Sequence, residues 1–168
     1  MLHATRPDGA AAPTPLPARL AAAILPVVAA SLLGGWVTRP KIPTWYAGLA
    51  KPAFTPPNAA FAPVWTLLFG LMAYALWRIL SRPAGPARAR AVAAFFGQLA
   101  LNVAWSFAFF GLESPGLALA VIAALLAAIL ATIRLFRPLD RVAAWLLAPY
   151  AAWVAYAAAV NLGVLILN

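Results

Sequence analysis

The sequence predicts an all-α integral membrane protein that forms a five-transmembrane-helix bundle. Of its 168 residues, 65% are hydrophobic and only 9% are charged, whereas soluble domains are about 45–50% apolar and roughly 25% charged. The apolar residues gather in runs long enough to cross a bilayer, which takes about 20 residues in a helix. Because backbone groups in lipid must hydrogen-bond within their own segment, we expect these runs to be helices.

One compact membrane domain, residues 18–168, is expected to follow a tail. Residues 1–17 are polar, rich in proline and alanine and aperiodic, which is typical of a disordered segment. The spans are predicted at about 18–38, 62–80, 90–111, 116–135 and 141–166. Short connections after the second, third and fourth spans predict that consecutive helices are antiparallel neighbours.

The first span is followed by a long connection, residues 39–61, whose sequence is unfavourable for a continuous helix. The stretch "WYAGLAKPAFTPPNAAFAPVW", residues 45–65, covers most of it. Four prolines deny this stretch a continuous helix and narrow its backbone freedom. These prolines are Pro52, Pro56, Pro57 and Pro63.

The second and fifth spans each carry a stripe that contains aromatic residues. The second-span stripe consists of Trp65, Phe69 and Met72. The fifth-span stripe consists of Tyr150, Trp153, Ala157 and Asn161. Asp140 is placed to cap the N-terminus of the fifth span, and Pro149 is expected to bend that helix. Arg78 and Arg134 lie near span ends, from which they can snorkel to the interface.

The third span has a polar face. Gln98, Asn102 and Ser106 recur every four residues and therefore share one side of the helix. Trp105 flanks this side. Amide side chains in hydrocarbon must find hydrogen-bond partners. This face can supply interhelical hydrogen bonds or polar contacts in a ligand pocket, and the residues alone leave both interpretations open.

A second face of the third span consists of small residues. Its members include Gly97, Ala100, Ala104 and Ala108. Small side chains let helix backbones approach closely in a membrane. Either a neighbouring helix of the same chain or a second copy of the protein is expected to pack there.

The positive charge predicts the orientation of the bundle. The net charge of +9 lies mostly at the ends of apolar runs, so it does not indicate nucleic-acid binding. The side of the N-terminus holds Arg6, Arg19, Arg78, Arg82, Arg88, Arg90, Arg134, Arg137 and Arg141. The other side holds Arg39, Lys41 and Lys51. The positive-inside bias therefore places the N-terminus in the cytoplasm and the C-terminus outside, without indicating which membrane.

The sequence lacks the groups of side chains that ordinary acid–base or metal catalysis requires. Its acidic residues are Asp8, Glu113 and Asp140, all in the tail or at span ends, and it has one histidine and no cysteine. We therefore assign no catalytic residue, no metal ligand and no obligatory cofactor. Aromatic walls with a few polar groups are typical of pockets for flat apolar ligands, so binding of such a small molecule fits better.

Three motifs, in order along the chain, resemble the TspO/MBR family of tryptophan-rich sensory proteins, which includes the mitochondrial translocator protein. The first is "WYAGLAKPAFTPP" followed by "FAPVWTLLF". The second is "QLALNVAWSFAFFG" in the third span, and the third is "LLAPYAAWVAYAAAVN" in the fifth. The resemblance covers residues 20 to 165, and the alanine-rich composition favours a bacterial member.

The resemblance implies a five-helix bundle with a pocket for porphyrins, such as protoporphyrin IX and haem, and for isoquinoline- or benzodiazepine-type drugs. Matched motif by motif, that pocket is implied at Tyr46, Trp65, Phe69, Asn102, Trp105, Trp153 and Ala157. The resemblance also implies a homodimer, for which the small-residue face of the third span is the natural interface. The cholesterol motif proposed for animal members is not matched, because Leu162 falls where its tyrosine would be and no basic residue follows.

With a pocket implied, the connection 39–61 is interpreted as a preformed lid, because a stiff loop loses less entropy when it is ordered over a ligand. Lys51 is the one charge in residues 45–65. It is predicted either to meet a porphyrin propionate or to serve as an interface-snorkelling or structural lysine.

The function expected from the resemblance is that of a membrane receptor or sensor for porphyrins, linked to tetrapyrrole homeostasis and stress signalling. Light-dependent porphyrin degradation is an enzymatic alternative, because tryptophans beside an excited porphyrin can supply electrons without an acid–base pair. Transport of porphyrin or lipid is a third alternative, and a purely structural partner of other membrane proteins is a fourth.

Overall fold

The computed structural model describes residues 15–168, and this part of the chain is helical without strands. The long helices are α1 (Leu16–Thr38), α3 (Asn58–Leu80), α4 (Pro86–Ser106), α5 (Pro115–Phe136) and α7 (Ala148–Leu167). The short helices are η1 (Arg39–Lys41), α2 (Trp45–Gly48), η2 (Phe107–Gly111) and α6 (Arg141–Leu146). Within the described residues, five helical segments are long and apolar enough to cross a membrane, which confirms the predicted fold class.

Most helices begin earlier than the hydropathy pattern predicts. Of the predicted tail, only residues 15–17 lie within the described part, and α1 already begins at Leu16. Helix α3 begins at Asn58 and α4 at Pro86, four residues before the predicted starts. Proline suits the first helical turn because the N–H it lacks would have no intrahelical partner. Hydropathy marks the continuously apolar part of a helix and misses the first turn before it.

The last span is not one bent helix, which corrects the prediction for residues 141–166. It is interrupted at Leu147, where α6 ends and α7 begins. Pro149 lies in the first turn of α7, where it removes no intrahelical hydrogen bond. Asp140 caps α6 as predicted, since its Oδ1 accepts a hydrogen bond from the Ala143 amide at 3.0 Å.

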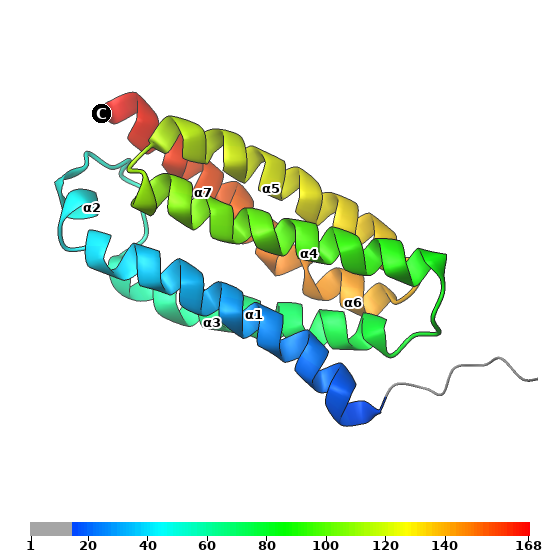
Figure 1. The fold of residues 1–168 in the computed structure, drawn as a ribbon. Helices are drawn as coiled ribbons and strands as arrows, with labels where there is room; N and C mark the ends of the chain where they lie inside the picture. Colours follow the sequence, from blue (N-terminus) through cyan, green and yellow to red (C-terminus); the bar gives the residue numbers. More distant parts are fainter. Residues whose placement is uncertain (1–14) are drawn as a thin grey trace, which may run out of the picture.

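The helices form a closed bundle in which neighbours in space are not always neighbours in sequence (Figure 1). Helix α1 packs against α3 and α4, α4 packs against α5, and α5 packs against α7. Helix α6 closes the ring by packing against α3. Figure 1 shows α2 and the C-terminus at one end of the bundle, with the α3–α4 turn and α6 at the other. We call the first the lid end and the second the basic end.

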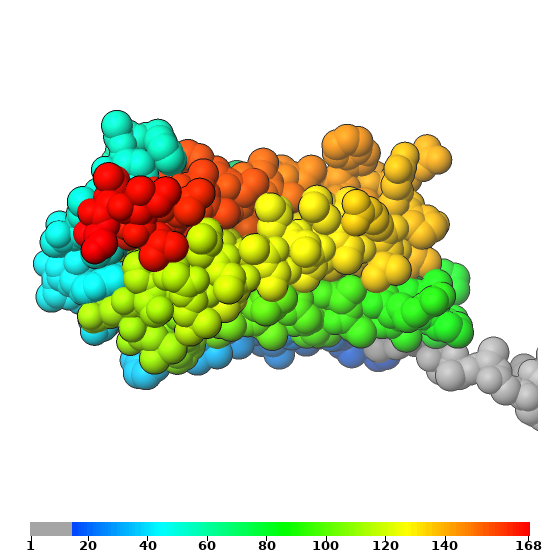
Figure 2. Space-filling view, turned by 90° about the horizontal axis from the view of Figure 1, so that it is seen from above, coloured from blue at the N-terminus to red at the C-terminus, as the bar shows by residue number. Residues whose placement is uncertain are grey.

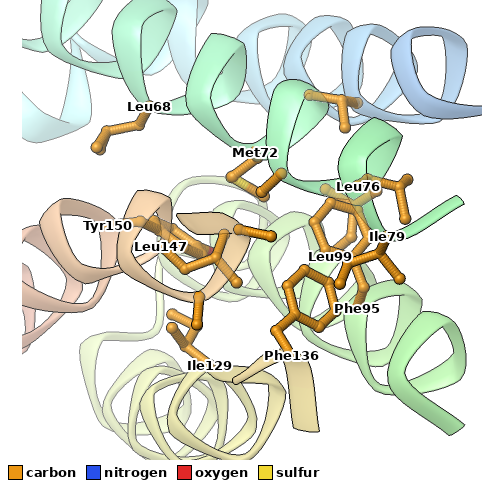
Figure 3. Packing of buried hydrophobic residues seen from close by; sticks show 14 of the residues in the cluster. Leu68, Met72, Leu76, Ile79, Phe95, Leu99, Ile129, Phe136, Leu147 and Tyr150 are labelled. Carbon is orange, nitrogen blue, oxygen red and sulfur yellow. The ribbon is translucent and has the colours of Figure 1, made fainter. Parts of the chain in front are cut away.

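The larger of two clusters of buried apolar residues reaches to the basic end, and Figure 3 shows part of it from close by. Met72, Leu76 and Ile79 of α3 lie over Phe95 of α4 and Phe136 of α5. The rings of Phe95 and Phe136 stack, with their centroids 6.2 Å apart and an angle of 10° between their planes. Close packing of these large side chains makes this part of the bundle solid.

The basic end is also held by an ionic cluster around the buried carboxylate of Asp140. Asp140 pairs with Arg78, whose Nε lies 2.9 Å from Asp140 Oδ2, and with Arg82. Arg78 was predicted to snorkel, and its guanidinium indeed lies near the end of α3, but Asp140 anchors it there. The cluster fastens the C-terminal end of α3 to the start of α6.

Candidate functional site

A cavity of about 270 Å³ occupies the half of the bundle toward the lid end. Its walls come from α1, α3, α4 and α7, and η1, α2 and η2 complete its rim. Ligand pockets are about 300–1,000 Å³ in size, so the cavity is slightly smaller than the lower end of that range. Toward the lid end, the bundle therefore holds this cavity beside a second, smaller cluster of buried apolar residues that includes Val37, Tyr46 and Phe109.

Small side chains produce the hollow. Helix α1 contributes Ala30, Ser31, Gly34 and Gly35, and Ala157 of α7 is also part of the wall. The backbones of α1 and α4 lie close together at Gly34, where an added Cβ would lie 3.2 Å from Ser106 Oγ. Short side chains on the cavity faces of α1 and α7 therefore leave space inside the bundle unfilled.

Aromatic rings line most of the remaining wall. Trp65 and Phe69 of α3 pair at 5.4 Å between centroids, and Trp65 also meets the edge of Tyr150 at 6.2 Å. Trp153 of α7 meets Phe61 at 6.1 Å. Such rings present flat, polarisable faces on which a planar apolar ligand can stack.

The wall contributed by α4 ends in a π-helical turn, η2. The Leu112 amide donates to the Phe107 carbonyl at 2.8 Å, which is the i to i+5 bond of a π-turn. The wider turn carries Phe109 and Phe110, which both line the cavity, and Phe109 stacks on Trp105 at 5.5 Å. Such turns are frequent at functional sites because they re-aim side chains.

The polar residues of the wall bind neighbouring helices. Asn102 Nδ2 donates to the buried Tyr150 hydroxyl at 3.0 Å, which links α4 to α7. Asn161 accepts from Trp105 Nε1 at 3.2 Å and donates to the Pro115 carbonyl at 2.8 Å. Asn102 therefore joins two helices, as the first interpretation of the polar face expects. It also lines the cavity, where its contact with a ligand stays a prediction. Gln98 is buried one turn earlier and makes no side-chain hydrogen bond within the described residues.

The connection between α1 and α3 covers the lid end of the cavity. Its Tyr46 is buried and lines the cavity, and burial raises the pKa of this phenol, with a smaller contribution from Tyr156. A neutral phenol at the cavity can donate a hydrogen bond to a ligand.

Helix α7 holds this connection in place. The Tyr156 hydroxyl donates to the Phe54 carbonyl, and Asn168 exchanges two hydrogen bonds of 3.0 Å with the backbone of Ala50. Figure 2 shows the last turns of α7 beside this connection. The closest approach is at Gly163, where an added Cβ would lie 2.7 Å from Pro52 Cγ. The lid is thus seated on α7, with no room for a larger side chain at Gly163.

Gly163→Ala is therefore expected to displace the lid and to lower the free energy of unfolding by roughly 1–3 kcal/mol, as overpacking does. The stiff Pro52 ring cannot turn aside, so the connection must shift. Thermal unfolding in detergent measures the effect. Gly70→Ala is the matched control, because an added Cβ at Gly70 meets nothing within 4 Å. Equal unfolding midpoints for the two variants would contradict this account of the lid.

Seven of the eight residues predicted to bind ligand line the cavity: Tyr46, Trp65, Phe69, Asn102, Trp105, Trp153 and Ala157. Lys51 does not line it. Its Nζ donates to the Leu49 carbonyl at 2.9 Å and lies 4.7 Å from the centroid of the Tyr46 ring. Lys51 therefore has the structural role that was the alternative to contact with a ligand.

The small-residue face of α4 is only partly exposed. Gly97, Ala100 and Ala104 lie on the surface of the chain. Ala108 is buried at 3% exposure and packs within the chain, so it is not available to a second copy. The predicted homodimer stays a prediction, with its contact face reduced to the first three residues.

Sequence reasoning missed the contribution of α1 and its continuation. Gly34 and Thr38 repeat at helical spacing on one side of α1, and Arg39 follows at the rim. Small residues repeated at this spacing are the feature of the sequence that could have identified α1 as part of the cavity wall. No group of three or more acidic, histidine or cysteine side chains that could hold a metal ion occurs in residues 15–168.

Comparison with known proteins places these features in a family. The sequence model of the TspO/MBR family matches residues 22–167. The chain is 40% identical over 153 residues to the tryptophan-rich protein TspO of Archaeoglobus fulgidus, covering 89% of this chain and 97% of the relative. It is 38% identical to the tryptophan-rich protein TspO of Chlorobaculum tepidum, covering 77% of this chain and 83% of that relative. The human translocator protein is 37% identical, with 70% of each chain covered.

Proposed function

The chain belongs to the TspO/MBR family, and on that premise we propose that it is a membrane receptor or sensor that binds porphyrins in the cavity at the lid end. The relatives' names, translocator protein and tryptophan-rich sensory protein, support a membrane protein of the sensor or receptor kind. Protoporphyrin IX and haem are the ligands we propose, with links to tetrapyrrole homeostasis and stress signalling. Drug-type ligands of the translocator protein would occupy the same cavity.

The observation that carries the proposal is the aromatic wall around the cavity. Trp65, Trp105 and Trp153 come from three different helices and line one cavity. A flat apolar macrocycle can stack on such faces and leave water or lipid behind, which favours binding. The lid is tied down before ligand arrives, so little ordering entropy is lost on binding.

The proposal is tested by titrating protoporphyrin IX, in the dark, into purified protein while tryptophan emission is recorded. Saturable quenching is expected, because three tryptophans line the cavity. Trp153→Ala is expected to weaken binding by about tenfold, which corresponds to about 1.4 kcal/mol of lost stacking and contact.

Trp145→Ala is the matched control for this titration, because Trp145 is 75% exposed on the outside of the bundle. Its removal is expected to leave the dissociation constant unchanged. The proposal fails if quenching does not saturate, or if the two tryptophan variants bind porphyrin as tightly as each other. A new absorbance product that forms only in light would instead indicate the enzymatic alternative, porphyrin degradation.

A further inference from the structure

Arg39 is the one charged residue among those that line the cavity. It begins η1, directly after α1, and its side chain is exposed at the rim. An added Cβ at Gly35 would lie 3.8 Å from Arg39 Nε. The arginine side chain therefore lies back over Gly35, another cavity residue, rather than away from the bundle.

The other two cations near the lid end are already engaged. Lys41 Nζ lies 2.7 Å from Glu113 Oε1, and Lys51 Nζ is held by the carbonyls of Leu49 and Ala47. Neither of them lines the cavity. Among the three, Arg39 alone combines a place at the cavity with a free charge.

No acidic side chain in the described part of the chain neutralises Arg39. That part has two acidic residues: Glu113, paired with Lys41, and Asp140, paired with Arg78 and Arg82 at the basic end. A guanidinium offers a planar fork of donors that matches the two oxygens of a carboxylate. The cavity thus has an apolar aromatic interior and an anion-binding group at its rim.

We propose that Arg39 binds a carboxylate of the ligand, and that the cavity therefore selects flat apolar molecules with a carboxylate at their edge over neutral molecules of the same shape. This inference rests on the proposed function, since it takes the porphyrin to be bound in this cavity. With the macrocycle among the aromatic rings, a propionate would reach Arg39. The contact with a propionate that the sequence offered to Lys51 is thus assigned to Arg39 of η1.

The test compares protoporphyrin IX with its dimethyl ester, which keeps the macrocycle and removes both negative charges. Dissociation constants are measured by tryptophan quenching for the unsubstituted protein, Arg39→Gln and Lys51→Gln. The unsubstituted protein is expected to bind the acid about tenfold more tightly than the ester, as charge-assisted hydrogen bonds allow. Arg39→Gln is expected to lose this preference by weakening acid binding while ester binding stays unchanged.

Lys51→Gln is expected to keep the full preference, which separates a specific contact from a general effect of positive charge. The inference is overturned if Arg39→Gln weakens both ligands equally, or if it leaves the preference intact. Failure of the proposed function looks different, because then neither the acid nor the ester gives saturable quenching of the unsubstituted protein. Thermal unfolding of each variant confirms that the bundle is still folded.

Discussion

Replacing Ala157 with phenylalanine is expected to reduce the affinity for protoporphyrin IX by at least about a hundredfold. Ala157 lies on the α7 wall of the cavity, one turn after Trp153. A phenyl ring at this position would enter the space that the macrocycle needs. Because the ring fills a hollow instead of a packed core, the bundle is expected to stay folded. Tryptophan quenching measures the affinity, and thermal unfolding measures the stability.

Ala159→Phe is the control for this substitution. Ala159 is on the same helix but is exposed on the outer face of the bundle. The same side-chain change there is expected to leave porphyrin affinity unaltered. If Ala157→Phe binds porphyrin as tightly as the unsubstituted protein, the cavity is not the binding site. If both variants lose affinity equally, the loss comes from a disturbance of helix α7 and not from the filling of the cavity.

Replacing Asp140 with asparagine is expected to give the largest loss of stability at the basic end. The Asp140 side chain is 2% exposed and pairs with Arg78 and Arg82. Asparagine also caps helices, so the substitution removes the charge and keeps the cap. Breaking a fully buried pair costs about 3–5 kcal/mol. The two arginine side chains are 24% and 43% exposed, so we expect a smaller loss, on the order of 2 kcal/mol.

The same cluster predicts how stability changes with pH. Burial by itself would raise the pKa of Asp140, but hydrogen bonds from Arg82, the Ala143 amide and Arg78 outweigh it and hold the pKa well below its ordinary value of 3.8. Because the pKa is lower in the folded than in the unfolded state, the stabilisation is fully present above about pH 4. It is lost as the pH falls further, through the folded-state pKa.

Denaturant unfolding in detergent, followed between neutral and acidic pH, tests both expectations for Asp140. The unsubstituted protein is expected to lose stability below about pH 4, and Asp140→Asn to lack this part of the loss. Glu113→Gln is the control, because neither side chain of its pair with Lys41 is buried, at 38% and 36% exposure, and such pairs contribute about 1 kcal/mol or less. A variant Asp140→Asn that matches the unsubstituted protein in stability and acid response would refute a structural role for the cluster.

The spans and most of the cavity could be predicted from the sequence, because they depend on local periodicity. The 3.6-residue repeat placed Trp65 with Phe69, and Trp153 with Ala157, on common helix faces, and these faces do line the cavity. The family motifs contributed Tyr46, which lies outside the spans and has no periodic signal.

The features that the sequence could not predict depend on contacts between distant segments. Ala108 belongs to a small-residue stripe, but α4 ends in the π-turn η2, which brings that part of the stripe inside the chain. Lys51 and Arg39 are both basic residues of the predicted lid, and only the path of the chain decides which one reaches the cavity. Pro149 marked the disturbed part of the last span, and only the fold shows that the chain there divides into α6, which packs against α3, and α7.

The most direct test of the central claim is an experimental structure of the protein with protoporphyrin IX. The expected result is macrocycle density inside the cavity, against Trp65 and Trp153, with one propionate directed toward Arg39. A second apolar groove, lined by Leu20, Ile24 and Trp77 among others, lies between α1 and α3 on the outside of the bundle. Density in that groove, with the cavity unoccupied, would contradict the claim that the aromatic cavity is the porphyrin site.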